Sequence, residues 1–378
     1  MSQPSAFKLG YRPELDGIRG ISILLVLAHH LSPSHLWGGF LGVDIFFVLS
    51  GFLITTLLIQ EWQECGEISL KNFYMRRFLR LMPALFLMLL SVCGFIWLFQ
   101  DSAKASAAFC GAGFTLAYIS NWIQALHPNY PMGPFGITWS LSIEEQFYLF
   151  WPMLLLMFLR LVKSQRMLII LLVIGIVTVT VNKVILWNTE GVSSWRLYYG
   201  TDTRADALLI GCLVSLLLII GMIHQRSNFE KYFKSGAAIS LAFMLAIIFT
   251  VKNDDRFLYV GGGTLIELML SVMLVVVLLW PPKQVLTVLR FPALRWFGQI
   301  SYGLYLWHWP IFVIFNPKRG IQSAPYRLAA AALAIALSAL SYYLIEKPAL
   351  KLKRRFEASS VPPGKTAYGT SELLVQNQ

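Results

Sequence analysis

The 378-residue chain is 57% hydrophobic and only 13% charged, with a mean hydropathy of +0.63. Because about a quarter of the residues of an average soluble domain are charged, this composition excludes an ordinary soluble globule. It predicts an all-α, polytopic integral membrane protein. The net charge of +12 is typical of basic cytoplasmic loops, so we expect a lipid bilayer and no nucleic acid as a partner. The four cysteines have no metal-ligand spacing, and we expect no metal.

Ten apolar runs are long enough to cross a bilayer. They cover about residues 18–36, 39–60, 81–100, 137–159, 167–187, 204–222, 236–251, 257–280, 297–316 and 325–346. Most of the 31 basic residues fall in the N-terminal segment and in alternate connections, which predicts that both termini are cytoplasmic. We therefore predict a multi-pass protein of the cytoplasmic (inner) membrane.

The domain organisation follows from these runs. Residues 1–355 are expected to form one transmembrane domain, and the Pro- and Gly-containing residues 356–378 a disordered cytoplasmic tail. A further run at 105–125 is interrupted by glycines and polar residues. An eleventh crossing there would place the following basic loops outside, so we expect this run to lie on, or dip into, the outer face.

Arg19 and His30 share the first predicted helix and are eleven residues apart. This spacing places both side chains on one face, about 16 Å apart along the axis. Ionisable residues at membrane depth usually mark a functional site. The alternative is that Arg19 extends to the cytoplasmic surface while His30 lies in water at the other end.

Two carboxylates are predicted at the depth of His30. Asp44 lies near the start of the second run, within the glycine-containing stretch 38–52, and Glu144 lies near the start of the fourth. A histidine with a carboxylate at one depth is sufficient for general-base activation of an alcohol, so we predict His30, Asp44 and Glu144 as catalytic residues. For Asp44 the alternative is a hydrated or helix-capping carboxylate. The neighbouring Glu145 fits a capping box with Ser142.

Arg76, Arg77 and Arg80 precede the third run, and Arg76 and Arg80 share a helix face. Three guanidinium groups at a membrane surface form a clamp for phosphate or pyrophosphate, or bind anionic lipid headgroups. Arg204 and Asp206, at the start of the sixth run, are close enough in sequence to neutralise each other. His308 in the ninth run is a single helical histidine, which is more often a hydrogen-bonded core residue than a catalyst.

Together these blocks resemble the acyltransferase-3 family of integral membrane acyltransferases, from about Tyr11 to Lys353. The matching elements, in family order, are Arg19 to His30, the FFxxSG element Phe46–Gly51, the RRxxR element Arg76–Arg80, the SLSxE element Ser140–Glu144, Ile300–Pro310 and Ile345–Pro348. The family also includes longer proteins with a fused extracytoplasmic SGNH-type domain, which we do not expect in this chain.

The resemblance implies an acyl-CoA donor, usually acetyl-CoA, on the cytoplasmic side and commonly an extracytoplasmic glycan as acceptor. It implies that His30 acts as a general base or transiently carries the acyl group. The cofactor-binding residues would be Arg19, Arg76, Arg77 and Arg80. The residues lining a substrate tunnel would be Ser50, Trp139, Tyr302, Trp307, His308 and Glu346. The glycan, the acyl chain length and the oligomeric state are left open.

Two other functions compete with a membrane O-acyltransferase. A transporter or flippase of a glycan or lipid intermediate would use buried charges as a pathway, but many transporters contain internal repeats and this sequence shows none. A non-catalytic membrane scaffold would give Arg19, His30 and Glu144 no reason to lie in a membrane.

Overall fold

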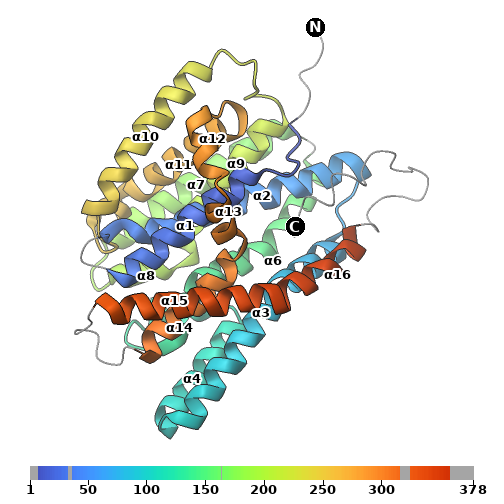
Figure 1. Cartoon of the computed structure of the whole chain (residues 1–378). Helices are drawn as coiled ribbons and strands as arrows, with labels where there is room; N and C mark the ends of the chain where they lie inside the picture. Colours follow the sequence, from blue (N-terminus) through green and yellow to red (C-terminus); the bar gives the residue numbers. More distant parts are fainter. Residues whose placement is uncertain (1–6, 33–35, 163, 316–323, 358–378) are drawn as a thin grey trace.

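The computed structural model describes residues 7–32, 36–162, 164–315 and 324–357, and within these ranges it contains helices and no strands (Figure 1). The longer helices are α1 (Pro13–Leu31), α2 (Leu41–Cys65), α3 (Leu70–Phe99), α6 (Trp139–Leu161), α7 (Gln165–Trp187), α9 (Thr201–Ile219), α10 (Glu230–Thr250), α11 (Gly263–Leu279), α14 (Ser301–Phe315) and α15 (Ala324–Ser341). The shorter helices are η1 (Trp37–Phe40), α4 (Ser102–Leu116), α5 (Ser120–Leu126), η2 (Gly133–Thr138), α8 (Ser194–Tyr199), η3 (Leu258–Gly262), α12 (Lys283–Leu289), α13 (Pro292–Gln299), η4 (Tyr342–Glu346) and α16 (Lys347–Glu357).

Within the described residues, each of the ten predicted membrane runs falls largely on helices. Six helical stretches of the described chain are long and apolar enough to cross a bilayer: Trp37–Cys65, Leu70–Phe99, Gln165–Trp187, Glu230–Thr250, Leu258–Leu279 and Pro325–Leu352. The chain is therefore a helical, multi-pass membrane protein. The other four runs correspond to α1, α6, α9 and α14. The first three of these helices contain charged residues, and the described part of α14 is 15 residues long. The count of ten therefore stays a prediction.

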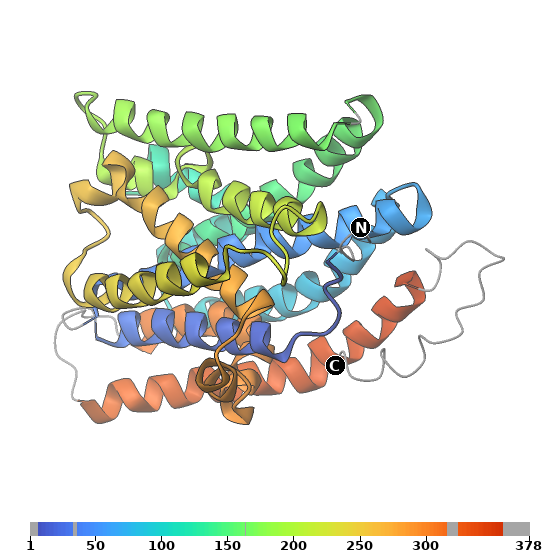
Figure 2. The same ribbon diagram turned by 90° about the horizontal axis from the view of Figure 1, so that it is seen from above.

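The two ends of the described chain lie on the same side. Figure 2 shows the described segment before α1 and the end of α16 on the same side of the molecule. The cytoplasmic orientation of that end and the single domain over 1–355 stay predictions. From residue 358 onward, the predicted tail lies outside the described ranges.

The ambiguous run at 105–125 forms two short helices instead of one span. The chain breaks between α4 and α5 at Tyr118, whose φ of 54° lies in the left-handed region. At about 1.5 Å per residue, neither helix reaches across a hydrocarbon core of about 30 Å. Figure 1 shows α4 beside α3, projecting from the rest of the molecule. The run is thus not an eleventh crossing, and its depth in the membrane stays a prediction.

The packing of α2 against α9 fixes the position of the FFxxSG element. Gly51 of α2 lies against the backbone of Leu208, and a Cβ at Gly51 would approach the Leu208 carbonyl oxygen to 1.9 Å. Across the same contact, a Cβ at Gly211 of α9 would approach the Val48 carbonyl oxygen to 2.2 Å. Glycines permit this close approach, which is how small residues assemble membrane helices.

We expect Gly51→Ala to destabilise the protein by about 1–3 kcal/mol or more, because backbone atoms on α9 would have to move. Gly94→Ala in α3 is the matched control, since a Cβ added at Gly94 would have no other atom within 4 Å and alanine is the better helix former. Thermal unfolding of both variants in detergent measures the difference. Equal melting temperatures would contradict the packing role of Gly51.

Candidate active site

A cavity of about 190 Å³ lies where α1, α2, α3, α6 and α14 meet. We call it the arginine cavity. Its polar side chains are Arg19, Ser50, Arg77, Arg80, Ser140, Glu144, Tyr148, Ser301, Tyr302 and Tyr305. Apolar residues of α2, with Leu81 of α3 and Leu141 of α6, complete the wall, so the polar groups share the cavity with hydrophobic side chains. This is the usual composition of a small-molecule site.

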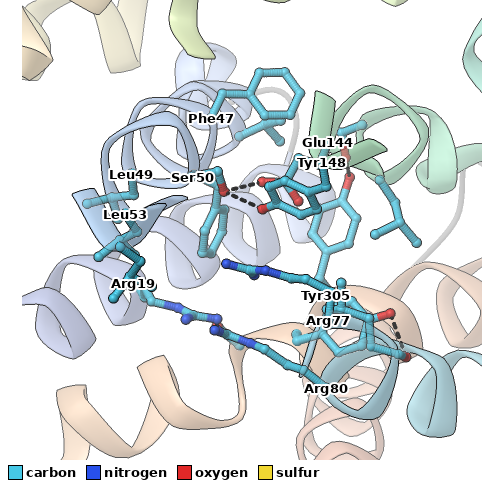
Figure 3. A pocket seen from close by; sticks show the side chains of 18 residues that line it. Arg19, Phe47, Leu49, Ser50, Leu53, Arg77, Arg80, Glu144, Tyr148 and Tyr305 are labelled. Atoms are coloured by element: carbon cyan, nitrogen blue, oxygen red, sulfur yellow. Dashed lines mark hydrogen bonds between the residues drawn. The ribbon is translucent and has the colours of Figure 1, made fainter. Parts of the chain in front are cut away.

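Three arginines converge on this cavity from two helices. Arg19 comes from α1, and Arg77 and Arg80 come from the first third of α3 (Figure 3). Among the described residues none of them forms an ion pair with a carboxylate. Arg19 donates from Nη2 to Ser301 Oγ at 3.1 Å, while its buried Nε has no partner there. Unpaired guanidinium groups in a partly open cavity are suited to an anionic ligand.

Arg76 lies elsewhere, although the sequence predicts it in the same clamp. Its Nη2 is 3.1 Å from Glu61 Oε2, and its Nη1 donates to the Phe356 carbonyl oxygen. The adjacent Arg77 instead lies over the Tyr148 ring, 4.7 Å from its centroid. Neighbouring side chains on a helix point about 100° apart. In the RRxxR element, Arg77 and Arg80 therefore line the cavity while Arg76 pairs with Glu61.

Ser50, Glu144 and Tyr148 form a hydrogen-bonded group inside the arginine cavity. Ser50 Oγ donates to Glu144 Oε1 at 2.6 Å, and the Tyr148 hydroxyl donates to Ser50 Oγ at 2.9 Å. Glu144 and Tyr148 are four residues apart on α6 and therefore share one face. Figure 3 shows these three side chains together, with the guanidinium groups opposite them.

His30 lies outside the arginine cavity and contacts a second histidine. Its Nδ1 donates to the Val26 carbonyl oxygen at 2.8 Å, and His308 Nδ1 donates to the Leu304 carbonyl oxygen at 2.9 Å. A carbonyl oxygen only accepts, so both neutral rings carry their proton on Nδ1. The two ring centroids are 5.1 Å apart, and His308 Nε2 is buried without a partner among the described residues.

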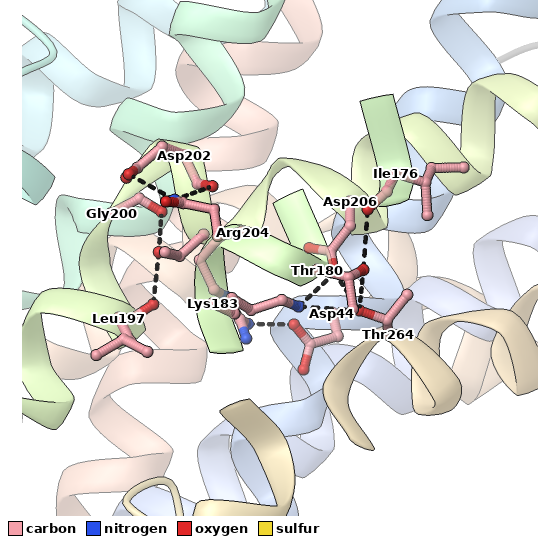
Figure 4. A network of polar contacts seen from close by, with 12 residues as sticks. Asp44, Ile176, Thr180, Lys183, Leu197, Gly200, Asp202, Arg204, Asp206 and Thr264 are labelled. Carbon is pink, nitrogen blue, oxygen red and sulfur yellow. Dashed lines mark hydrogen bonds and ion pairs between the residues drawn. The ribbon is translucent and has the colours of Figure 1, made fainter. Parts of the chain in front are cut away.

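In the described chain, Asp44 hydrogen-bonds to neither His30 nor Glu144, and its carboxylate has another partner. It pairs with Arg204 of α9, and next to this pair Lys183 of α7 pairs with Asp206 (Figure 4). Thr264 of α11 donates to Asp206 Oδ2 at 2.6 Å. We call Asp44, Lys183, Arg204, Asp206 and Thr264 the ionic network. Their proximity in sequence suggests that Arg204 and Asp206 neutralise each other. In the structure, each of them instead pairs with a charged residue on another helix.

The predicted tunnel residues lie in four different places. Ser50 and Tyr302 line the arginine cavity. Trp139 packs between Phe47 of the cavity wall and Arg204 of the ionic network. Trp307 and His308 are buried further along α14, and Glu346 accepts from Ser341 Oγ at 3.1 Å. The roles of all these residues stay predictions.

Tyr148 and Tyr305 are cavity residues that the sequence interpretation misses. Tyr148 could have been found, because it lies one helical turn after Glu144. Tyr305 hydrogen-bonds to Ser140 from α14 and donates to the Ile137 carbonyl oxygen at 2.9 Å, contacts between segments more than 160 residues apart. A sequence pattern within one helix cannot predict a contact between segments so far apart.

The family model described as an acyltransferase domain, Acyl_transf_3, matches residues 12–345. The chain belongs to the acyltransferase-3 family. The match includes every helix that lines the arginine cavity. It confirms the family resemblance of the six motifs. No solved structure matches the chain.

The chain is also similar to several curated proteins that are named as O-acetyltransferases. The acyltransferase-3 chain is 35% identical over 365 residues to the peptidoglycan O-acetyltransferase OatA of Listeria monocytogenes, covering 93% of this chain and 58% of that protein. It is 33% identical over 349 residues to the putative peptidoglycan O-acetyltransferase YrhL of Bacillus subtilis, covering 89% and 55%. A putative O-acetyltransferase of Staphylococcus aureus is 33% identical over 351 residues, covering 90% and 58%. The chain thus spans somewhat more than half the length of these curated relatives.

Proposed function

We propose that this protein is a membrane O-acetyltransferase. In this proposal it moves an acetyl group from cytoplasmic acetyl-CoA to a hydroxyl of an extracytoplasmic glycan, with a peptidoglycan sugar as the first candidate. The family match and the names of the relatives support acyl transfer to a cell-wall glycan. The identity of the donor rests on the arginine cavity.

The observation that carries the proposal is the combination of positive charges and a carboxylate within one cavity. Arg19, Arg77 and Arg80 supply positive charge without an ion-pair partner in the described chain, and a coenzyme A donor brings several phosphate charges. The Ser50–Glu144 hydrogen bond lies in the same cavity, where a carboxylate can accept a proton from an alcohol. A transporter of an uncharged lipid or glycan would not need arginines without counter-charges in the same cavity as a carboxylate bonded to a hydroxyl.

The outer part of the site is assigned to the glycan. His30 and His308 lie beyond the arginine cavity, near the end of α1 that the charge pattern places outside. A second, small cavity of about 30 Å³ adjoins His30 and Arg327 there. In the proposal, the Nε2 atom of His30 accepts the hydrogen bond of the incoming sugar hydroxyl beside His308, and no metal takes part.

Mass spectrometry of cell-wall glycans tests the function in cells that contain the intact gene, a deletion or His30→Ala. We expect the deletion to remove O-acetyl groups, and the intact gene to restore them. The His30→Ala gene should restore few O-acetyl groups, because it lacks one imidazole of the His30–His308 pair. The His29→Ala gene should restore more of them. His29 Nδ1 is engaged with the Leu36 carbonyl oxygen, and the eleven-residue spacing selects His30.

An unchanged acetyl content in the deletion strain, on glycans and on exported metabolites alike, would contradict the enzyme. Export or uptake of an unmodified glycan that depends on the gene but not on acetyl-CoA would instead support the transporter alternative. Full restoration by His30→Ala together with loss in His29→Ala would assign the chemistry to the other imidazole.

A further inference from the structure

Ser50 differs from every other hydroxyl in the arginine cavity. Its Oγ donates to a carboxylate, Glu144 Oε1, at 2.6 Å. Ser301 Oγ accepts from Arg19, the Tyr302 hydroxyl donates to the Leu81 carbonyl oxygen, and Ser140 shares a hydrogen bond with Tyr305. Within the described chain, Ser50 is therefore the one cavity hydroxyl that is bonded to a general base. A hydroxyl within reach of a base is the geometry of an activated nucleophile.

The same contact explains what Glu144 does. The sequence places Glu144 and Asp44 at the depth of His30, as partners of its imidazole. In the structure each of the three candidates has a partner of its own: Glu144 has Ser50, Asp44 has Arg204, and His30 has the Val26 carbonyl oxygen and the His308 ring. The base in the cavity that contains the arginines is thus Glu144, and the histidines lie at a separate position.

A hydroxyl bonded to a base, inside the cavity that is assigned to the donor, suggests that the transfer has two chemical steps. We propose that Ser50 is a covalent acyl carrier, and that the transfer proceeds through an acyl ester on its Oγ. This inference rests on the proposed function, and it adds an intermediate to it. The intermediate would also let coenzyme A leave before the glycan hydroxyl arrives.

In the first step, Glu144 accepts the proton of Ser50 as Oγ attacks the thioester carbonyl carbon. The new C–O bond forms, the C–S bond breaks, and the departing thiolate takes the proton from Glu144 to give free coenzyme A. Tyr148 donates to Ser50 Oγ and orients it. Arg19, whose Nε has no partner among the described residues, supplies positive charge for the oxyanion that develops in the cavity.

In the second step, the acceptor hydroxyl attacks the carbonyl carbon of the serine ester. A new C–O bond forms to the acceptor, the bond to Ser50 Oγ breaks, and the acceptor proton returns to Oγ. The two steps together convert a thioester and an alcohol into an ester and a thiol, with no oxidant or reductant. A double displacement of this kind predicts ping-pong kinetics.

Isotope exchange tests the first step without any acceptor. The full-length protein in lipid nanodiscs is incubated with acetyl-CoA and isotopically labelled coenzyme A, and the label entering acetyl-CoA is measured. We expect exchange by the wild type, none above background in Ser50→Ala, and a decrease of about 10²–10⁴-fold in Glu144→Gln. The matched control is Glu145→Gln, because Glu145 is adjacent in sequence but does not line the cavity, and it should exchange like the wild type.

Peptide mass spectrometry after a brief incubation with ¹³C-acetyl-CoA locates the acyl group. We expect the label on the peptide that contains Ser50. Ser50→Cys provides a second readout if Ser50→Ala folds poorly, since its acyl adduct is a thioester that neutral hydroxylamine cleaves while it leaves an oxygen ester intact. Melting temperatures of all variants identify any loss of folding.

The outcomes separate this inference from the proposed function. Exchange by Ser50→Ala at the wild-type rate, or a label on His30, overturns the serine carrier. Acceptor acetylation in cells together with neither exchange nor label in the wild type also overturns it, and leaves direct transfer as the mechanism. A wild-type protein that does not bind acetyl-CoA overturns the proposed function, and the carrier with it.

Discussion

Asp44→Ala is expected to lower the stability of the protein by about 3–5 kcal/mol, because it leaves the guanidinium of Arg204 buried without its counter-charge. The Asp44 and Arg204 side chains are only 4% and 7% exposed, so water cannot replace the missing carboxylate. Thermal unfolding in detergent measures the effect. The double variant Asp44→Ala/Arg204→Met removes both charges and should be more stable than the sum of the two single changes predicts.

An exposed pair at the start of α10 provides the control. The Glu230 and Lys234 side chains are each 45% exposed, and Glu230→Ala should cost no more than about 1 kcal/mol. The experiment also decides between two roles for Asp44. If Asp44→Ala keeps its melting temperature and loses acetyl transfer, Asp44 is the catalytic residue that the sequence predicts, and the structural role is wrong.

Arg77→Ala and Arg80→Ala are each expected to weaken acetyl-CoA binding by about tenfold to a hundredfold. A charge-assisted hydrogen bond contributes about 1.5–3 kcal/mol, and each 1.4 kcal/mol is a factor of ten. Titration calorimetry of the protein in nanodiscs measures the dissociation constants. Raising the salt concentration should reduce the difference between wild type and variants, because part of the attraction is screened.

Arg76→Ala is the informative comparison for this experiment. Arg76 is next to Arg77 in the sequence, but it pairs with Glu61 and does not line the arginine cavity. We expect its affinity for acetyl-CoA to change by less than about threefold. If Arg76→Ala and Arg77→Ala lose equal affinity for acetyl-CoA, the three-arginine clamp predicted from the sequence is correct, and the coenzyme binds outside the cavity.

A further variant separates charge from stacking at Arg77. The guanidinium lies 4.7 Å from the centroid of the Tyr148 ring, and Tyr148 holds Ser50. Arg77→Lys keeps the charge but loses the planar stacking group. We expect it to retain most of the coenzyme affinity and to slow the exchange reaction. A loss of affinity as large as in Arg77→Ala would show that the planar group itself binds the phosphates.

The positions of the helices and the family of the chain are both encoded in the sequence alone. An apolar run of about 20 residues is long enough to cross a bilayer, and within the described residues each of the ten runs falls largely on helices. The order of the motifs along the chain indicates the acyltransferase-3 family, which the family model confirms. The broken run at 105–125 was also recognised as different, because charge on either side of it constrains the number of crossings.

Which charge meets which partner depends instead on the tertiary structure. A sequence specifies the depth of a residue along its helix and the face on which it lies, but not which neighbouring helix that face contacts. Glu144, Asp44 and His30 share a predicted depth, yet the packing of α2 against α9, and of α6 and α14 around the cavity, gives each a different neighbour. These contacts join segments that are often more than 90 residues apart, and no local periodicity encodes them.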